Sequence, residues 1–175
     1  MKVACIQLSS GEDYTKNFKD IIKYVNQAIK NQADLIITPE TSSLMSADKK
    51  NLFKYSYEMN NDPIIKKVKL IAKSKKKWIL LGSMCIKEKN KLRNRSILIG
   101  PNGKINTYYD KINMFDVKVS KKEQHKESEV FKAGKKLVSA TLPWGKLGLS
   151  ICYDLRFPEL YRNLSKRNLS FITVP

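Results

Sequence analysis

The sequence contains few of the side chains from which metal sites and disulfide frameworks are built. It has a single histidine, His125, and three widely spaced cysteines, Cys5, Cys85 and Cys152, with no Cys-x-x-Cys pair among them. A zinc site needs a cluster of such ligands and a disulfide framework needs paired cysteines, so we expect neither. Cys5 and Cys85 lie inside apolar runs and are predicted to be small buried hydrophobic residues.

Long hydrophobic runs are missing as well. No apolar stretch approaches the ~18 residues that a membrane-spanning helix requires. Residues 1–6 are typical of a first β-strand, and no small-residue cleavage site of a secretory signal follows them. We therefore predict a cytoplasmic protein without a membrane partner.

Arginine is scarce although the chain is strongly basic. The formal net charge is +18, yet only five of the 34 basic residues are arginine, and the lysines form short clusters such as 75–77 and 121–122. Base readout and bidentate phosphate contacts favour arginine. We expect no specific nucleic-acid partner, only weak attraction to polyanions at low salt. A basic nucleic-acid-binding module stays open as an alternative, which salt-dependent binding with sequence preference would support.

The sequence does contain enough apolar material for one core. Its 175 residues are 42% hydrophobic, which predicts a single globular domain over residues 1–175. Helical spacing of apolar residues predicts helices at 14–31, 64–74 and 160–166. Short β-prone runs bounded by turn residues predict strands at 3–8, 33–38, 78–86, 95–99, 105–109, 137–142, 146–152 and 169–174. This order indicates an α/β fold with a mixed sheet and helices over one face.

Residues 117–131 form the one polar stretch without a regular pattern. They fall between two segments that end on chemically useful side chains, Lys111 and Cys152. We predict that this stretch is an irregular loop over a functional site.

Three β-prone runs each end on one ionisable side chain. The first leads into Pro39-Glu40, the second into Asp110-Lys111, and the third into Cys152. A thiol at the end of a buried strand can be presented rigidly to a pocket, but it needs a base and an oxyanion stabiliser from elsewhere. Glu40 and Lys111 are the candidates. Taken one at a time, a glutamate or lysine is more often a surface residue and a cysteine core filler.

In their order and flanking residues, these segments resemble the nitrilase superfamily of carbon–nitrogen hydrolases. The resemblance covers residues 1–175, and its most specific element is the block Cys-Tyr-Asp-Leu-Arg-Phe-Pro-Glu-Leu-Tyr-Arg at 152–162. It implies an α-β-β-α sandwich in which Glu40 is the general base, Lys111 stabilises the tetrahedral intermediate and Cys152 is the nucleophile. Domains of the family extend further, so we expect an N-terminal portion of such a domain, with the C-terminal part missing.

The resemblance also implies supporting residues. Glu127-Ser128 matches a second glutamate of the small amidases, which would orient Lys111 and the substrate; the neighbours Glu123 and Glu129 are the alternatives. The backbone N–H of Tyr153 would complete an oxyanion hole. No metal and no cofactor are implied, and the substrate-binding residues stay unassigned.

Residues 110–117 and 127–128 look most like the branch that includes ω-amidase and deaminated-glutathione amidase. That likeness implies a hydrolase that converts a small carboxylate-bearing amide, such as deaminated glutathione or an α-keto-ω-amide, to an acid and ammonia through a cysteine thioester. It also implies a homo-oligomer at full length. A truncated, inactive fragment of the same fold remains the other interpretation.

Overall fold

The computed structural model describes residues 1–120 and 123–175 of the chain. The lysine pair 121–122, one of the basic clusters of the sequence, lies outside the described residues. Within the described parts, a five-stranded sheet, a three-stranded sheet and four α-helices surround two apolar cores, and a separate two-stranded sheet extends from them.

The larger sheet has five strands in the order β1-β2-β3-β4-β5. Its strands are β1 (Val3–Cys5), β2 (Leu35–Ile37), β3 (Trp78–Glu88), β4 (Lys91–Ile99) and β5 (Ile105–Asp110). The first three run parallel, and β3, β4 and β5 are joined as antiparallel hairpins. Parallel neighbours need a crossover, and helices supply it here.

Three helices accompany this sheet: α1 (Tyr14–Lys30), α2 (Lys49–Tyr55) and α3 (Pro63–Lys75). Helix α3 begins as its sequence predicts, with Pro63 in the first turn and the carboxylate of Asp62 accepting the backbone N–H of Ile65 at 3.0 Å. The apolar faces of α1 and α3 pack on one face of the sheet. Helix α2 was not expected, because Lys49, Lys50 and Lys54 leave it little apolar periodicity.

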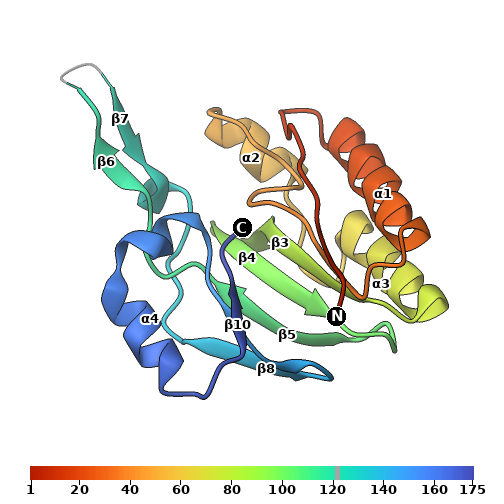
Figure 1. Cartoon of the computed structure of the whole chain (residues 1–175). Helices are drawn as coiled ribbons and strands as arrows, with labels where there is room; N and C mark the ends of the chain where they lie inside the picture. The colour runs from red at the N-terminus through yellow and green to blue at the C-terminus, as the bar shows by residue number, and fades with distance from the viewer. Residues whose placement is uncertain (121–122) are drawn as a thin grey trace.

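The second sheet has three strands in the order β10-β9-β8. They are β8 (Val138–Leu142), β9 (Gly145–Leu149) and β10 (Phe171–Thr173). Helix α4 (Pro158–Ser165) lies outside this sheet, away from the five-stranded one. Figure 1 thus shows the layers helix, sheet, sheet, helix, which confirms the α-β-β-α sandwich. The single mixed sheet predicted from the strand order was too simple, since the strands divide among three sheets of five, three and two strands.

The alternation of side chains along the central strands builds both cores. Ile79 and Leu81 of β3 point to the helices, whereas Leu80 between them packs against the three-stranded sheet. Successive residues of a strand face opposite sides, so a continuous apolar run is what a strand covered on both faces requires. Burying each such side chain contributes about 1.5–3 kcal/mol.

The stretch 117–131 is more regular than its sequence suggests. Its described part contains a hairpin of β6 (Asp116–Lys118) and β7 (Gln124–Lys126), followed by the short 3₁₀ helix η1 (Glu127–Glu129). The hairpin extends away from the two sheets (Figure 1). The prediction of an irregular loop is therefore wrong for these residues: backbone pairing forms the hairpin without any apolar pattern.

The structure also bears on the expected burial of two cysteines and on the expected absence of a membrane-spanning helix. Cys85 is buried as predicted, but Cys5 is exposed, because it ends the edge strand β1. None of the helices in the described parts of the chain has the length and apolar character that a membrane crossing demands.

Candidate active site

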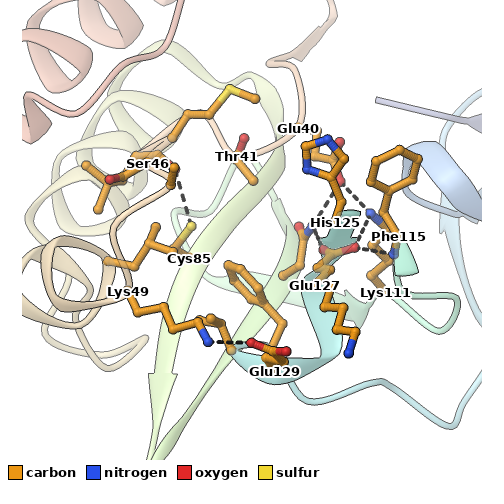
Figure 2. A pocket seen from close by; sticks show the side chains of 18 of the residues that line it. Glu40, Thr41, Ser46, Lys49, Cys85, Lys111, Phe115, His125, Glu127 and Glu129 are labelled. Atoms are coloured by element: carbon orange, nitrogen blue, oxygen red, sulfur yellow. Dashed lines mark hydrogen bonds and ion pairs between the residues drawn. The ribbon is translucent and has the colours of Figure 1, made fainter. Parts of the chain in front are cut away.

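One cavity collects most of the ionisable residues singled out in the sequence. It has a volume of about 800 Å³ and is bordered by the segment after β2, the start of α2, the middle of β3 and β4, the end of β5, the hairpin with η1, and Cys152. Figure 2 shows Glu40, Lys111 and Glu127 converging on one side of it, with Lys49 and Glu129 at another part of its wall. The size is that of a small-molecule site.

Glu40 is held by a tight connection between its loop and β3. The backbone N–H of Thr41 donates to Ser83 Oγ at 2.7 Å, and the N–H of Ser83 donates to the Pro39 carbonyl at 3.1 Å. Gly82 permits this approach: a β-carbon there would lie 1.8 Å from the Thr38 carbonyl oxygen. The loop therefore has little freedom, and the Glu40 carboxylate is fixed toward the cavity.

Lys111 is the buried cation of the site. It directly follows β5, and its side chain is only 2% exposed. Its Nζ donates to Glu40 Oε1 at 2.9 Å and to Glu127 Oε2 at 2.8 Å. Burial by itself would lower the pKa of this lysine, but the two carboxylates outweigh burial and raise it. Lys111 is thus a fixed ammonium ion between two acids.

Glu127, rather than its neighbours, joins this cluster. Its carboxylate also accepts the backbone N–H of Phe115 at 2.7 Å. Glu123 instead pairs with His125 at 3.2 Å, and Glu129 forms an ion pair with Lys49 across the cavity (Figure 2). The geometry therefore distinguishes Glu127 from the two acids that the sequence left as alternatives.

Asn94 of β4 connects the same two carboxylates. Its Nδ2 donates to Glu40 Oε1 and to Glu127 Oε1, both at 2.9 Å. Sequence reasoning missed this residue. The available signal was its place inside a strand that ends in an apolar run, because an asparagine in a buried strand needs hydrogen-bond partners.

Cys152 lies at a sharp turn after β9. Its φ of 42° is a left-handed conformation that is strained for a residue with a β-carbon. The predicted strand continues only to Leu149, and Cys152 instead opens the 3₁₀ helix η2 (Cys152–Arg156). Its backbone N–H donates to the carbonyl of Pro175 at 2.9 Å. Strain of this kind persists only where surrounding contacts hold the backbone in place.

Asp154 supplies those contacts. It is completely buried, and its carboxylate accepts the backbone N–H of Ile151 at 3.0 Å, the hydroxyl of Tyr109 at 2.7 Å, and the backbone and side-chain N–H groups of Asn113 at 2.9 and 2.8 Å. One carboxylate therefore ties the Cys152 turn to β5 and to the segment that follows Lys111.

The thiol of Cys152 is held protonated by its surroundings. Burial, followed by the charge of Glu40 and a hydrogen bond with it, raises the pKa of Cys152 to about 11, and Lys111 opposes this shift. Cys85 also borders the cavity, but complete burial is the main cause that raises its pKa to about 12. Of these two thiols, only Cys152 is exposed.

Tyr153 occupies the first turn of η2. Backbone N–H groups in a first helical turn have no partner within the helix and can face a negative charge. The ring of Tyr153 packs edge-on against Phe115 at 5.1 Å and Phe157 at 5.5 Å between ring centres. Within residues 1–120 and 123–175, no group of three or more histidine, cysteine or acidic side chains is arranged to hold a metal ion.

The arrangement brings a thiol, a carboxylate and a cation paired with that carboxylate into one cavity. Such a set can move a proton and stabilise an oxyanion at neighbouring points, which is the chemistry of acyl transfer through a covalent intermediate. The fold and the cluster together define a hydrolase-like α/β sandwich with a cysteine–glutamate–lysine centre.

Comparison with known proteins gives the family. The family model described as carbon-nitrogen hydrolase matches residues 2–174. The chain therefore belongs to the carbon–nitrogen hydrolase family.

Curated relatives and solved structures agree with this placement. The chain is 32% identical to a deaminated glutathione amidase of Yersinia enterocolitica, over 99% of this chain and 61% of that protein. It is 34% identical to one of Dictyostelium discoideum, over 97% and 61%. The crystal structure of the C. elegans NitFhit protein superposes with a TM-score of 0.90 at 29% identity, over 99% of this chain and 43% of that one. The chain thus spans about three fifths of the length of these two relatives.

Proposed function

We propose that the protein is an amidase that hydrolyses a small carboxamide through a thioester on Cys152. The observation that carries the proposal is that one cavity brings the Cys152 thiol together with Glu40, whose carboxylate is paired with Lys111. Two relatives named as deaminated glutathione amidases support the reaction class.

In the first half of the reaction, Glu40 accepts the thiol proton as Cys152 Sγ attacks the amide carbon. The carbonyl oxygen becomes an oxyanion, stabilised by the Lys111 ammonium and the Tyr153 backbone N–H. Glu40 then returns the proton to the amide nitrogen, the C–N bond breaks, and ammonia leaves. A resting thiol with a pKa of about 11 fits this order, because the thiolate forms only as the proton is transferred.

In the second half, Glu40 accepts a proton from a water molecule that attacks the thioester. The second tetrahedral intermediate collapses to a carboxylic acid, and the proton returns to Cys152 Sγ. The sum is one amide and one water converted to one acid and one ammonia. Glu127 orients Lys111 in both halves through its hydrogen bond to Nζ.

For the substrate we propose a short amide that carries a carboxylate, such as deaminated glutathione or an α-keto-ω-amide. The cavity wall combines apolar groups, among them Leu44, Met45 and Phe131, with the cationic side chains of Lys49 and Lys126. Such a wall fits a short carbon chain that ends in an anion.

The setting of the reaction is also proposed. We propose that residues 1–175 form part of a single carbon–nitrogen hydrolase domain, that the protein acts in the cytoplasm, and that it assembles as a homo-oligomer. Light scattering on the purified protein tests the assembly.

Ammonia release from a panel of small carboxamides tests the activity. We expect turnover by the unaltered chain and by Cys5→Ala, which removes an exposed thiol far along the sequence from the site, and none by Cys152→Ala. Turnover that survives in Cys152→Ala would contradict the proposal. So would a folded protein whose Cys152 is readily alkylated but which releases no ammonia from any amide of the panel.

A further inference from the structure

Asn94 contacts all three charged residues of the cluster from the centre of β4. The backbone carbonyl oxygen of Asn94 accepts the backbone N–H of Lys111 at 3.0 Å. The side-chain Nδ2 donates to one oxygen of Glu40 and to one of Glu127, at 2.9 Å each. The residue is 1% exposed. No other described side chain donates to both carboxylates except Lys111 itself.

The orientation of the Asn94 amide is fixed by charge. Ionised carboxylates only accept hydrogen bonds, so the NH₂ group must face them and the Oδ1 atom must face the other way. There, Oδ1 is buried without a hydrogen-bond partner in the described structure. A buried unsatisfied acceptor is costly and rare in native proteins. The two N–H donors of Asn94 are therefore the groups directed at the acids.

The charge balance explains what these donors accomplish. Two carboxylates share one ammonium ion, which leaves an excess negative charge, and neighbouring carboxylates tend to share a proton. A neutral group that donates to the ionised form of both acids opposes that proton uptake without adding a cation that would compete with Lys111. Both donors to Glu40 reach Oε1, so Oε2 is the oxygen left to receive the thiol proton.

We propose that Asn94 is a positioning residue that holds the carboxylates of Glu40 and Glu127 together beside Lys111 and leaves one oxygen of Glu40 free for the thiol. The inference rests on the proposed function in that it assigns the Cys152 proton to Glu40. The titratable groups around the pair come from several elements: Lys111 after β5, Cys152 of η2, Cys85 of β3, His125 and Lys126 of β7, and Lys49 and Glu129 across the cavity.

Alkylation of Cys152 by chloroacetamide tests the proposal without any amide turnover. The rate is followed by intact mass between pH 5 and 10 in the full chain, where ionised Glu40 assists the reaction. In Asn94→Leu the acids lose their neutral donor, take up a proton more readily, and the lower limb of the rate profile moves up by about one pH unit, a tenfold slower reaction on that limb. Asn94→Asp adds a third carboxylate and moves the limb further. Asn94→Thr keeps one donor and moves it least.

Asn17→Asp is the matched control. Asn17 is also buried and donates through Nδ2 to two oxygens, but these are the carbonyls of Gly11 and Ser43. The Asn17→Asp variant should lower the thermal midpoint, because it buries an acid. It should leave the lower limb of the pH–rate profile for Cys152 alkylation unchanged. The proposal is overturned if the limb stays unchanged in folded Asn94→Leu and Asn94→Thr, or if Asn17→Asp moves it equally. A shifted limb in a protein that hydrolyses no amide would sustain this inference while the proposed function failed.

Discussion

The two sheets contribute to the site in different ways. The five-stranded sheet and the segments next to it supply Glu40, Asn94 and Lys111, which are held to one another by side-chain hydrogen bonds and ion pairs. The three-stranded sheet leads to Cys152 alone. The backbone of this turn is held by the hydrogen bond to Pro175 and by the Asp154 carboxylate, which accepts the backbone N–H of Ile151. The five-stranded side therefore determines the charges around the thiol, and the three-stranded side determines where the thiol lies.

This difference teaches that the two halves should fail differently. Changes among the charged residues should alter how protons bind, with the turn intact. Changes around the turn should make the position of the Cys152 thiol less fixed, while its pKa stays nearly constant. Asp154 is the point at which the halves meet, since it contacts Tyr109 and Asn113 on one side and Ile151 on the other.

The largest effect is expected for Lys111→Met. It removes the cation that lies between Glu40 and Glu127, and breaking a buried ion pair by deleting one partner costs about 3–5 kcal/mol. Amide turnover should fall by at least about 10³-fold, because the oxyanion also loses its charged donor. Chemical denaturation and ammonia release measure the two losses.

Lys49→Met is its control. Lys49 pairs with Glu129 on the exposed wall of the same cavity, and such pairs contribute roughly 0–1 kcal/mol. If Lys111→Met and Lys49→Met lowered the free energy of unfolding equally, the buried ion pairs of Lys111 would contribute no more to stability than the exposed pair of Lys49.

Glu40→Gln should lower the pKa of the Cys152 thiol and, at the same time, slow amide turnover. Because the charge of Glu40 helps to raise the pKa of Cys152 to about 11, its removal lowers that pKa and more thiolate is present at any pH below it. Turnover nevertheless falls by about 10²–10⁴-fold, since the group that moves the proton is gone. Ultraviolet titration of the thiolate in a Cys5→Ala background gives the pKa. An unchanged or higher pKa would refute the contact between Glu40 and the thiol.

Asp154→Asn should have the smallest effect on activity and act on the other half. The new NH₂ group faces donors, so hydrogen bonds to the turn are lost, and the free energy of unfolding falls by about 2 kcal/mol. We expect roughly tenfold slower turnover with the alkylation limb of Cys152 unmoved. Tyr109→Phe, which removes one donor and keeps the carboxylate, should cost less, about 1 kcal/mol. A shift of the limb in Asp154→Asn would break the division between the halves.

The regular parts of the fold were predictable because their signals are local. Helices α1 and α3 follow from apolar spacing and from the residues that begin them, and β3 to β5 follow from β-prone runs separated by turn residues. The division into two sheets was not, since it depends on which strands pair, and pairing leaves no mark on single strands. The hairpin of β6 and β7 was missed for the same reason.

The site was predictable where residues follow strands and unpredictable where they lie within them. Glu40, Lys111 and Cys152 each come directly after a β-prone run, and such ends meet at one edge of a sandwich. Asn94 sits in the middle of a strand, and only the contacts of its side chain reveal its role. Cys5 was predicted to be buried because its neighbours are apolar, but the edge position of β1 exposes it.

The hydrogen bond from the Cys152 backbone to Pro175 makes the reactive turn a reporter of distant folding. An amide proton exchanges with deuterium only when its hydrogen bond opens, so the exchange of this one proton measures how often the segment after β10 leaves its place. Every opening of that segment also removes one of the contacts that hold the strained φ of Cys152. The geometry of the nucleophile therefore depends in part on the docking of residues more than twenty positions along the chain.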